Sequence, residues 1–278
     1  MNSEPHASST SEIEVIRAQL PRGGYRAAIF DFDGTLSLVR RNWQAVMIPM
    51  MVDVLKETGT DETPDALAAH VEDFVMRLNG KQTIYQMIQL AEEVEARGAA
   101  PLEPLEYKHR YHDLLWEQVG ERVRQLETGE ATTEEMTVPR THEFLTTLAD
   151  RGIALYLASG TDLKYVRREA ELLDVARFFG EHIYGALDDY QNFSKRMIVD
   201  RIIEDTGVPG EQLLGFGDGF VEIEEVRRGG GVAIGVASEE ETRQGVNAWK
   251  RNRLIEAGAD VIIPDYREMT RLLDLRGI

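Results

Sequence analysis

Short apolar runs alternate with amphipathic stretches in two parts of the chain. The apolar runs are bounded by Gly, Asp or Ser, and they predict buried strands at residues 27–30, 153–158, 213–216, 232–236 and 261–263. Apolar residues at helical spacing predict helices over residues 163–173, 196–206, 221–228 and 239–257. This alternation is typical of βαβ units. We therefore expect an α/β fold with a Rossmann-like parallel sheet covered by helices on both faces.

Residues 39–136 interrupt the alternation. They contain no strand pattern, and apolar residues at helical spacing predict helices at residues 50–56, 64–78, 83–97 and 104–126. Pro49 is expected to break or kink the first of these. The sequence therefore predicts an all-helical domain at 39–136, inserted into an α/β core formed by residues 21–38 and 137–278. The hinges are expected near residues 37–39 and 137–139.

The first twenty residues are polar and have no apolar segment after a basic start, so residues 1–20 are predicted to be a flexible tail and not a secretory signal. The longest uncharged run, residues 42–52, is too short to span a membrane. The chain has no cysteine, which excludes disulfides and cysteine nucleophiles and agrees with a cytoplasmic location.

The chain is strongly acidic. It has 31 Lys and Arg against 49 Asp and Glu, a formal net charge of −18. Such a surface repels nucleic-acid phosphates and anionic lipid, so we expect neither a nucleic-acid nor a membrane partner. Monomer and homodimer both remain open.

Four groups of polar residues are predicted at strand ends or helix starts, where ligands bind in parallel α/β sheets. The first contains Asp31 and Asp33, in the sequence DFDGTL. Side chains two positions apart in an extended segment face the same way, and Gly34 permits a sharp turn. One carboxylate could attack covalently while the other transfers a proton. A solvated junction rich in Asp and Gly explains the pair equally well.

The second group is Ser159 and Gly160, which follow the second predicted strand and are expected to open a helix. Free N–H groups and the helix dipole favour an anion there, and the Ser159 hydroxyl would add a donor. Simple helix capping by Thr161 or Asp162 is the alternative, and for this group alone it is the favoured one.

Lys195 forms the third group. Ser194 is expected to cap a helix, so Lys195 falls in the first turn, where the helix dipole disfavours a cation. Departures from local rules are common at functional sites. The alternative is a solvated surface lysine, with Arg196 as another candidate cation.

The fourth group is Asp218 and Glu222, in the sequence GDGFVE after the third predicted strand. Carboxylates gathered in this way suit a hard cation such as Mg²⁺, which prefers oxygen ligands. The alternative is an acidic N-cap followed by an acidic first turn, which are both routine.

In their order along the chain, the four groups resemble the motifs of the haloacid dehalogenase-like hydrolase superfamily. DFDGTL after an apolar strand is the specific signal, and the resemblance covers residues 25–36 and 140–266. It implies that Asp31 is a nucleophile that forms an aspartyl-phosphate. It also implies that Asp33 is first a general acid and then the base that activates water.

The resemblance further implies a phosphate site and a metal site. Ser159, Gly160 and Lys195 would hold the phosphoryl oxygens. Mg²⁺ would be held by the Asp31 carboxylate, the Asp33 backbone carbonyl and the Asp218 carboxylate. Glu222 stands where the family commonly has an outer-shell Asp, and this departure leaves its role open.

A carboxylate at Asp33 separates the chain from relatives that resemble the dehalogenases or the phosphonate hydrolases. The resemblance therefore implies a Mg²⁺-dependent phosphatase of a small phosphorylated metabolite, with the helical insert as its cap. A phosphomutase acting on sugar phosphates would carry the same motifs and is the alternative. A phospho-receiver domain would lack Asp33 and the insert. An inactive binding protein is favoured only by Glu222.

Three basic residues are candidate specificity determinants. Arg40 and Arg41 follow the first hinge and could reach an anionic group of the substrate. Lys81 lies at the start of a predicted helix, where an anion would be favoured. Solvated basic surfaces are the alternative for all three. Residues 249–251 (WKR) are interpreted as an extra helical segment that packs on the surface or forms a subunit contact.

Overall fold

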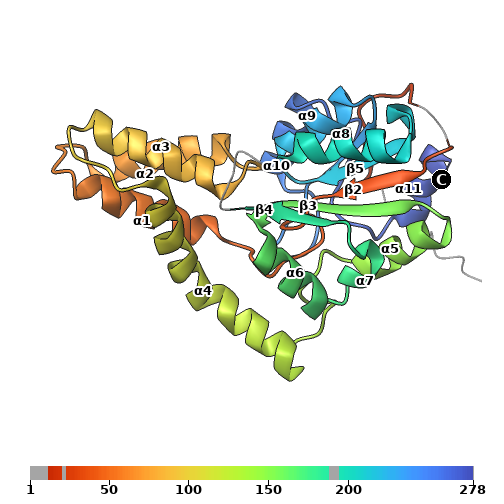
Figure 1. The fold of residues 1–278 in the computed structure, drawn as a ribbon, viewed down its shortest axis with the longest axis horizontal. Coiled ribbons are helices and arrows are strands. Elements are labelled where there is room, and N and C mark those ends of the chain that lie inside the picture. The colour runs from red at the N-terminus through yellow and green to blue at the C-terminus, as the bar shows by residue number, and fades with distance from the viewer. Residues whose placement is uncertain (1–11, 21–22, 188–193, 278) are drawn as a thin grey trace, which may run out of the picture.

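A seven-stranded sheet forms the centre of the protein, whose computed structural model describes residues 12–20, 23–187 and 194–277 (Figure 1). The strand order is β1-β7-β6-β5-β2-β3-β4, and every neighbouring pair is parallel except β1 with β7. The strands are β1 (Glu14–Val15), β2 (Ala27–Phe30), β3 (Ala154–Asp162), β4 (Ile183–Ala186), β5 (Leu213–Gly217), β6 (Val232–Val236) and β7 (Val261–Ile263). The predicted parallel α/β sheet is confirmed.

Helices cover both faces of this sheet (Figure 1). One face carries α5 (Thr141–Asp150), α6 (Leu163–Leu172), α7 (Ala176–Phe179) and α11 (Met269–Arg276). The other carries α8 (Lys195–Thr206), α9 (Phe220–Arg228) and α10 (Ala248–Glu256), with a short 3-10 turn at Gly210–Gln212. Successive residues of β2 alternate between the two apolar clusters, which is why this central strand is apolar throughout.

Aromatic side chains fill the core beneath β2. The Phe30 and Phe216 rings stack with centroids 4.6 Å apart, and Phe144 stacks on Tyr266 at the same distance. The Tyr266 hydroxyl donates a hydrogen bond to the Thr35 carbonyl oxygen over 3.0 Å. This hydrogen bond therefore attaches the loop that follows β2 to the aromatic core.

The helical insert, residues 39–136, projects from the carboxyl edge of the sheet (Figure 1). Its helices are α1 (Gln44–Lys56), α2 (Pro64–Arg77), α3 (Thr83–Ala96) and α4 (Pro104–Thr128). The two chain segments that enter and leave it pair with each other, because the Leu38 amide donates to Met136 and the Val138 amide donates to Leu36. These paired segments lie at residues 37–39 and 137–139, where the hinges are predicted.

Three sequence expectations about helices and chain ends differ from the structure. Helix α1 runs unbroken through Pro49, because burial of neighbours such as Met47 and Met51 outweighs the one hydrogen bond that the proline ring removes. The helix predicted at 239–257 forms only as α10, because the Asn247 side chain caps it by accepting from the Lys250 amide. Residues 14 and 15 of the predicted tail pair with β7 as an edge strand. The tail's first eleven residues lie outside the described part.

Short elements with weak apolar patterns were not predicted, namely β4, α5, α7 and α11.

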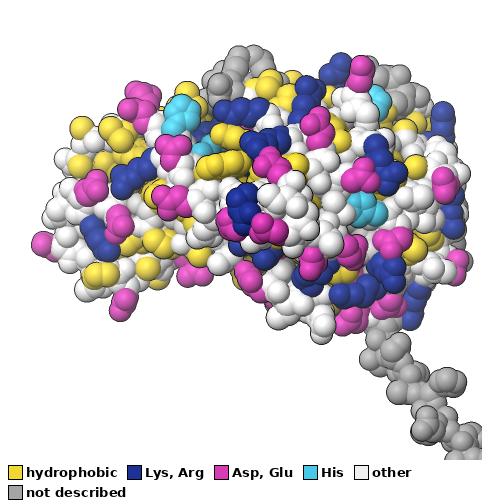
Figure 2. Space-filling view, turned by 90° about the horizontal axis from the view of Figure 1, so that it is seen from below, with side chains coloured by type: hydrophobic (Ala, Val, Ile, Leu, Met, Phe, Trp, Pro, Cys, Tyr) yellow, Lys and Arg dark blue, Asp and Glu magenta, His cyan; other side chains and the backbone are white. Residues whose placement is uncertain are grey.

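Charged side chains of both signs are interspersed over the face that Figure 2 shows, so the acidic excess forms no separate patch there. Within the described ranges, no helix combines the length and the apolarity needed to cross a bilayer.

Two adjacent phenylalanines of α7 test the core assignment. Phe179 is buried with its ring edge on Phe30, whereas Phe178 is partly exposed beside Arg177. We expect Phe179→Ala to lower the free energy of unfolding by about 3–5 kcal/mol. Phe178→Ala should cost about 1 kcal/mol. Denaturant unfolding of both variants measures the difference, and equal costs would contradict this packing.

Candidate active site

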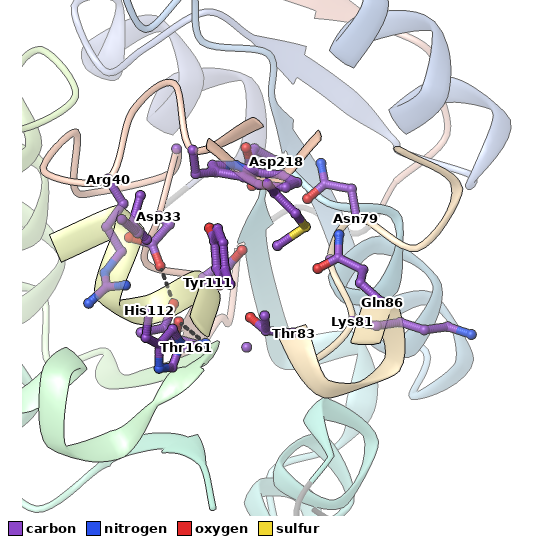
Figure 3. A pocket seen from close by; sticks show the side chains of 18 of the residues that line it. Asp33, Arg40, Asn79, Lys81, Thr83, Gln86, Tyr111, His112, Thr161 and Asp218 are labelled. Atoms are coloured by element: carbon purple, nitrogen blue, oxygen red, sulfur yellow. Dashed lines mark hydrogen bonds between the residues drawn. The ribbon is translucent and has the colours of Figure 1, made fainter. Parts of the chain in front are cut away.

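Members of all four predicted groups line one pocket between the carboxyl edge of the sheet and the helical insert, and Glu222 alone is not among the lining residues. Figure 3 shows Asp33 and Asp218 in this pocket. Strands β2, β3 and β5 are parallel neighbours, so the residues that follow them emerge side by side. The core residues that line the pocket are Asp31, Asp33, Gly34, Ser159, Gly160, Thr161, Lys195, Asp218 and Glu240.

Asp31 and Lys195 form a buried ion pair, with the Lys195 Nζ 2.9 Å from Asp31 Oδ1. Lys195 begins α8 after the Ser194 cap and makes a second ion pair with the buried Glu222. Burial raises the pKa of Asp31, the Lys195 ammonium opposes that shift, and the nearby Asp218 carboxylate adds to it. Lys195 therefore stabilises an ionised Asp31 in a site with little water.

Asp33 is poised between its protonated and ionised forms. Loss of hydration raises its pKa to about 7 against the opposing charge of Arg40. The Thr161 hydroxyl donates to Asp33 Oδ2 over 2.8 Å, drawn as a dashed line in Figure 3. The other oxygen, Oδ1, is buried and has no hydrogen-bond partner among the described residues. Such a carboxyl group can both donate and accept a proton near neutral pH.

Ser159 and Gly160 lie in the pocket, but they do not open a helix. Strand β3 continues beside β4 to Asp162 with an irregular register, and α6 begins only at Leu163. The helix predicted at 163–173 is therefore confirmed as α6, whereas the strand before it is longer than the predicted 153–158, because pairing with β4 extends it to Asp162. The Ser159 hydroxyl oxygen accepts from the Thr161 amide over 3.0 Å.

Asp218 has a counter-ion that the sequence did not reveal. Lys250 of α10 places its Nζ 2.8 Å from Asp218 Oδ2 and 2.6 Å from Glu240 Oε1. Burial alone would lower the pKa of Lys250, but the two carboxylates outweigh it and raise that pKa. Residues 249–251 are therefore not uniformly a surface segment, since Trp249 is 42% exposed and Lys250 only 6%.

Gly34 permits the close approach of the Asp31–Asp33 loop to Asp218. Its φ is +74°, and a Cβ there would clash with Asp218 Oδ2. A side chain at this position would push the two acidic segments apart. The glycine of DFDGTL thus serves both the turn and the contact.

The donor set fits a hard divalent cation. Asp31 and Asp218 are close enough that one raises the pKa of the other, and a bound cation would relieve this repulsion. No three Asp, Glu or His side chains cluster as metal ligands in the described part of the chain. A cation would therefore take two carboxylates, which agrees with the way Mg²⁺ is held by one or two carboxylates together with water. The cation would bind the same Asp218 carboxylate that pairs with Lys250.

The helical insert supplies the opposite wall of the pocket. Its contribution is mostly uncharged: Trp43, Met47, Asn79, Gly80, Thr83, Gln86, Tyr111, His112 and Leu115. The backbone of the loop between α2 and α3 closely approaches the backbone of the core. A Cβ on Gly80 would lie 3.2 Å from the Gly219 Cα, and one on Gly160 would lie 3.0 Å from the Lys81 carbonyl oxygen.

The three candidate specificity residues have different positions. Arg40 lines the pocket and is buried in an ion pair with Glu169 of α6. Lys81 reaches the rim, but its side chain lies over the Tyr85 ring and extends away from the pocket (Figure 3). Arg41 is not among the lining residues, and its guanidinium contacts the Leu38 carbonyl instead.

The raised pKa of Asp33 predicts a pH-dependent stability. Between its ordinary pKa of 3.8 and about 7, the folded state holds a proton that the unfolded state has released, so folding weakens as pH rises through this window. Relative to Asp33→Asn, the wild type should lose about 2 kcal/mol of unfolding free energy between pH 5.5 and pH 7 in metal-free buffer.

Denaturant unfolding at each pH measures this difference. The exposed Asp53→Asn is the matched control, and its difference from the wild type should not vary with pH. A constant difference for Asp33→Asn would show that the Asp33 carboxyl titrates normally.

Comparisons with known proteins show a family by sequence and a likeness of fold by structure. A family model for haloacid dehalogenase-like hydrolases matches residues 25–230. A predicted phosphoglycolate phosphatase from Haemophilus somnus 129pt is 16% identical, with a TM-score of 0.59 over 89% of this chain and 97% of the other. A β-phosphoglucomutase from Clostridium difficile is 13% identical, with a TM-score of 0.59 over 91% and 97%.

A third similar structure is a hydrolase of the same family from Deinococcus radiodurans R1 with bound phosphate and sodium. It is 17% identical, with a TM-score of 0.53 over 90% of this chain and 96% of the other. At these identities the likeness is one of fold. No curated protein matches the chain significantly.

Proposed function

The chain belongs to the haloacid dehalogenase-like hydrolase family, and from that premise we propose that it is a Mg²⁺-dependent phosphatase of a small phosphorylated metabolite. The observation that carries the proposal is one pocket that joins the Asp31–Lys195 ion pair to an Asp33 carboxyl with a pKa of about 7. The first group supplies a nucleophile, and the second supplies a proton donor and acceptor.

In the first step an Asp31 carboxylate oxygen attacks phosphorus, and the bond from phosphorus to the ester oxygen breaks. The protonated Asp33 gives its proton to that oxygen, so the product leaves as a neutral alcohol. Asp31 then carries the phosphoryl group as an aspartyl-phosphate. Lys195, together with the Ser159 and Gly160 segment, would hold the phosphoryl oxygens.

In the second step Asp33, now ionised, takes a proton from a water molecule that attacks the same phosphorus atom. The bond from phosphorus to Asp31 breaks, inorganic phosphate leaves, and both carboxyl groups return to their starting states. A pKa near 7 suits both roles, because neither protonation state is strongly disfavoured at neutral pH.

The proposed Mg²⁺ would be held by the carboxylates of Asp31 and Asp218 and the Asp33 backbone carbonyl. When bound, it would supply positive charge beside the phosphoryl group. Glu222, which pairs with Lys195, would position that ammonium. Such local positive charge is needed in a chain whose net charge is −18.

The helical insert would act as a cap. Its α2–α3 loop contacts the core next to the site, and ion pairs such as Lys108 with Asp162, at 2.5 Å, join the two parts. A capped pocket excludes water and bulky substrates, which supports a small metabolite over a phosphoprotein. A phosphomutase is the second candidate, since the similar structures include a β-phosphoglucomutase. Steady release of inorganic phosphate distinguishes the phosphatase from it.

Replacing the nucleophile should abolish turnover. We expect Asp31→Asn to lower kcat for phosphate release at least about 10³-fold, because the amide cannot form the acyl-phosphate. The exposed Asp53→Asn should keep wild-type activity. Colorimetric phosphate release measures both. Wild-type turnover by Asp31→Asn would exclude the proposed mechanism.

Removing the metal should stop the reaction reversibly. EDTA should reduce phosphate release to background, and excess Mg²⁺ should restore it. Mg²⁺ should also raise the melting temperature of the wild type, because a ligand that binds only the folded state stabilises it. The shift should be smaller for Asp218→Asn. Activity that is indifferent to EDTA would contradict a metal at this site.

A further inference from the structure

The pocket wall built by the insert indicates what the rest of the substrate is like. We propose that the substrate is the phosphate ester of a neutral, hydroxyl-bearing compound, such as a polyol or a sugar, and carries no second anionic group. This inference rests on the phosphatase function proposed above. It is carried by the neutral polar wall around the pocket and by the nearby basic groups, each of which is paired with a carboxylate, turned away from the pocket or uncharged.

Arg40 would be the obvious partner for a second anion, but Glu169 already neutralises it. The Arg40 Nε lies 3.0 and 3.1 Å from the two Glu169 oxygens, and the Nη2 lies 2.6 Å from Oε1. Both side chains are buried, at 7% and 1% exposure. An anion that drew Arg40 away would leave Glu169 buried and unpaired, which is strongly unfavourable.

The other basic groups near the pocket are also unavailable. Lys195 is paired with Asp31 and Glu222, and in the proposed reaction it serves the transferred phosphoryl group. The Lys81 side chain extends away from the pocket (Figure 3). Burial lowers the pKa of His112 to about 4, so its ring is neutral at pH 7. Among the described lining residues, no uncompensated cation faces the space beyond the phosphate site.

Neutral hydrogen-bonding groups face that space instead. Figure 3 shows the Asn79 and Gln86 amides on the wall opposite Arg40, with Thr83 beside them. Gln86 donates to the Val75 carbonyl over 3.1 Å, which fixes its amide. The side chains of Asn79 and Thr83 make no hydrogen bond within the described part of the chain, so they are available to a ligand.

Amide and hydroxyl groups can donate and accept at once, as the hydroxyls of a polyol require. A hydroxyl placed against them exchanges hydrogen bonds with water for hydrogen bonds with protein at little cost. A carboxylate or a second phosphate would lose its hydration without gaining a counter-ion, which costs far more. The same wall therefore favours alcohols and disfavours acids of equal size.

Two matched pairs of substrates test this directly. Glycerol 3-phosphate differs from 3-phosphoglycerate only in a terminal CH₂OH in place of a carboxylate, and sorbitol 6-phosphate differs from 6-phosphogluconate in the same way. We expect kcat/KM to favour the alcohol at least about 10-fold in one pair or both. p-Nitrophenyl phosphate reports phosphatase activity independently of this wall.

The outcomes separate the two proposals. If p-nitrophenyl phosphate is hydrolysed but neither alcohol exceeds its matching acid, the neutral-substrate inference is overturned and the phosphatase proposal stands. If p-nitrophenyl phosphate and all four esters are inert with Mg²⁺ present, the proposed function itself fails, and the inference fails with it.

Variants that change the charge of the pocket test whether that charge causes the preference for alcohols over acids. Glu169→Gln keeps a hydrogen-bond acceptor for Arg40 but frees its charge, so the ratio of kcat/KM for acid over alcohol should rise at least about 10-fold. Thr83→Lys adds a cation to the wall without disturbing Glu169 and should shift the ratio in the same direction. Each ratio compares two substrates on one enzyme, so losses of folding or of general activity cancel.

Glu171→Gln is the matched control, because Glu171 lies on the exposed side of the same helix. It should leave the ratio unchanged. If Glu169→Gln does not fold, the ratio measured for Thr83→Lys alone tests the inference. An unchanged ratio in every folded charge variant of the wall would overturn the inference, because it would show that pocket charge does not select the substrate.

Discussion

Buried carboxylates at the carboxyl edge of the sheet are the constraint on which the rest of the site depends. Their charge cannot be hydrated there, so each must be paired or protonated. Four buried cations meet this need: Lys195, Lys250, Arg40, and Lys108, which pairs with Asp162 at the end of β3. Lys195 joins the end of β2 to α9, Lys250 joins α10 to the end of β5, and Arg40 joins the insert to α6. Charge pairing therefore also holds together the segments that form the pocket.

Asp33 is the exception among these carboxylates. It has the Thr161 hydroxyl as a partner but no cation in direct contact among the described residues, so its pKa rises to about 7. Arg40 would lower that pKa further if Glu169 did not offset its charge. The Arg40–Glu169 pair thus has two effects. It keeps the pKa of Asp33 at about 7, and it neutralises a cation that could otherwise bind an anionic substrate.

Close backbone contacts complete the arrangement. Gly34 lets Asp218 approach the loop after β2, and Gly80 and Gly219 let the insert approach the core. These contacts place the Asn79 side of the insert across from the acidic groups of the core. The groups proposed to react thus follow the strands of the sheet, while the insert supplies the opposite wall of the pocket.

The sequence by itself determined the parallel sheet, the helical insert and the meeting of Asp31, Asp33, Lys195 and Asp218. Apolar periodicity is a local signal, and the order of the four groups along the chain resembles that of the family's motifs. Only the tertiary structure decided the counter-ions and the neutral wall. Arg40 and Glu169 are 129 positions apart, and Lys250 lay in a segment interpreted as surface. Ion pairs between residues so far apart produce no periodic pattern in the sequence, because they depend on how the packed elements face each other in space.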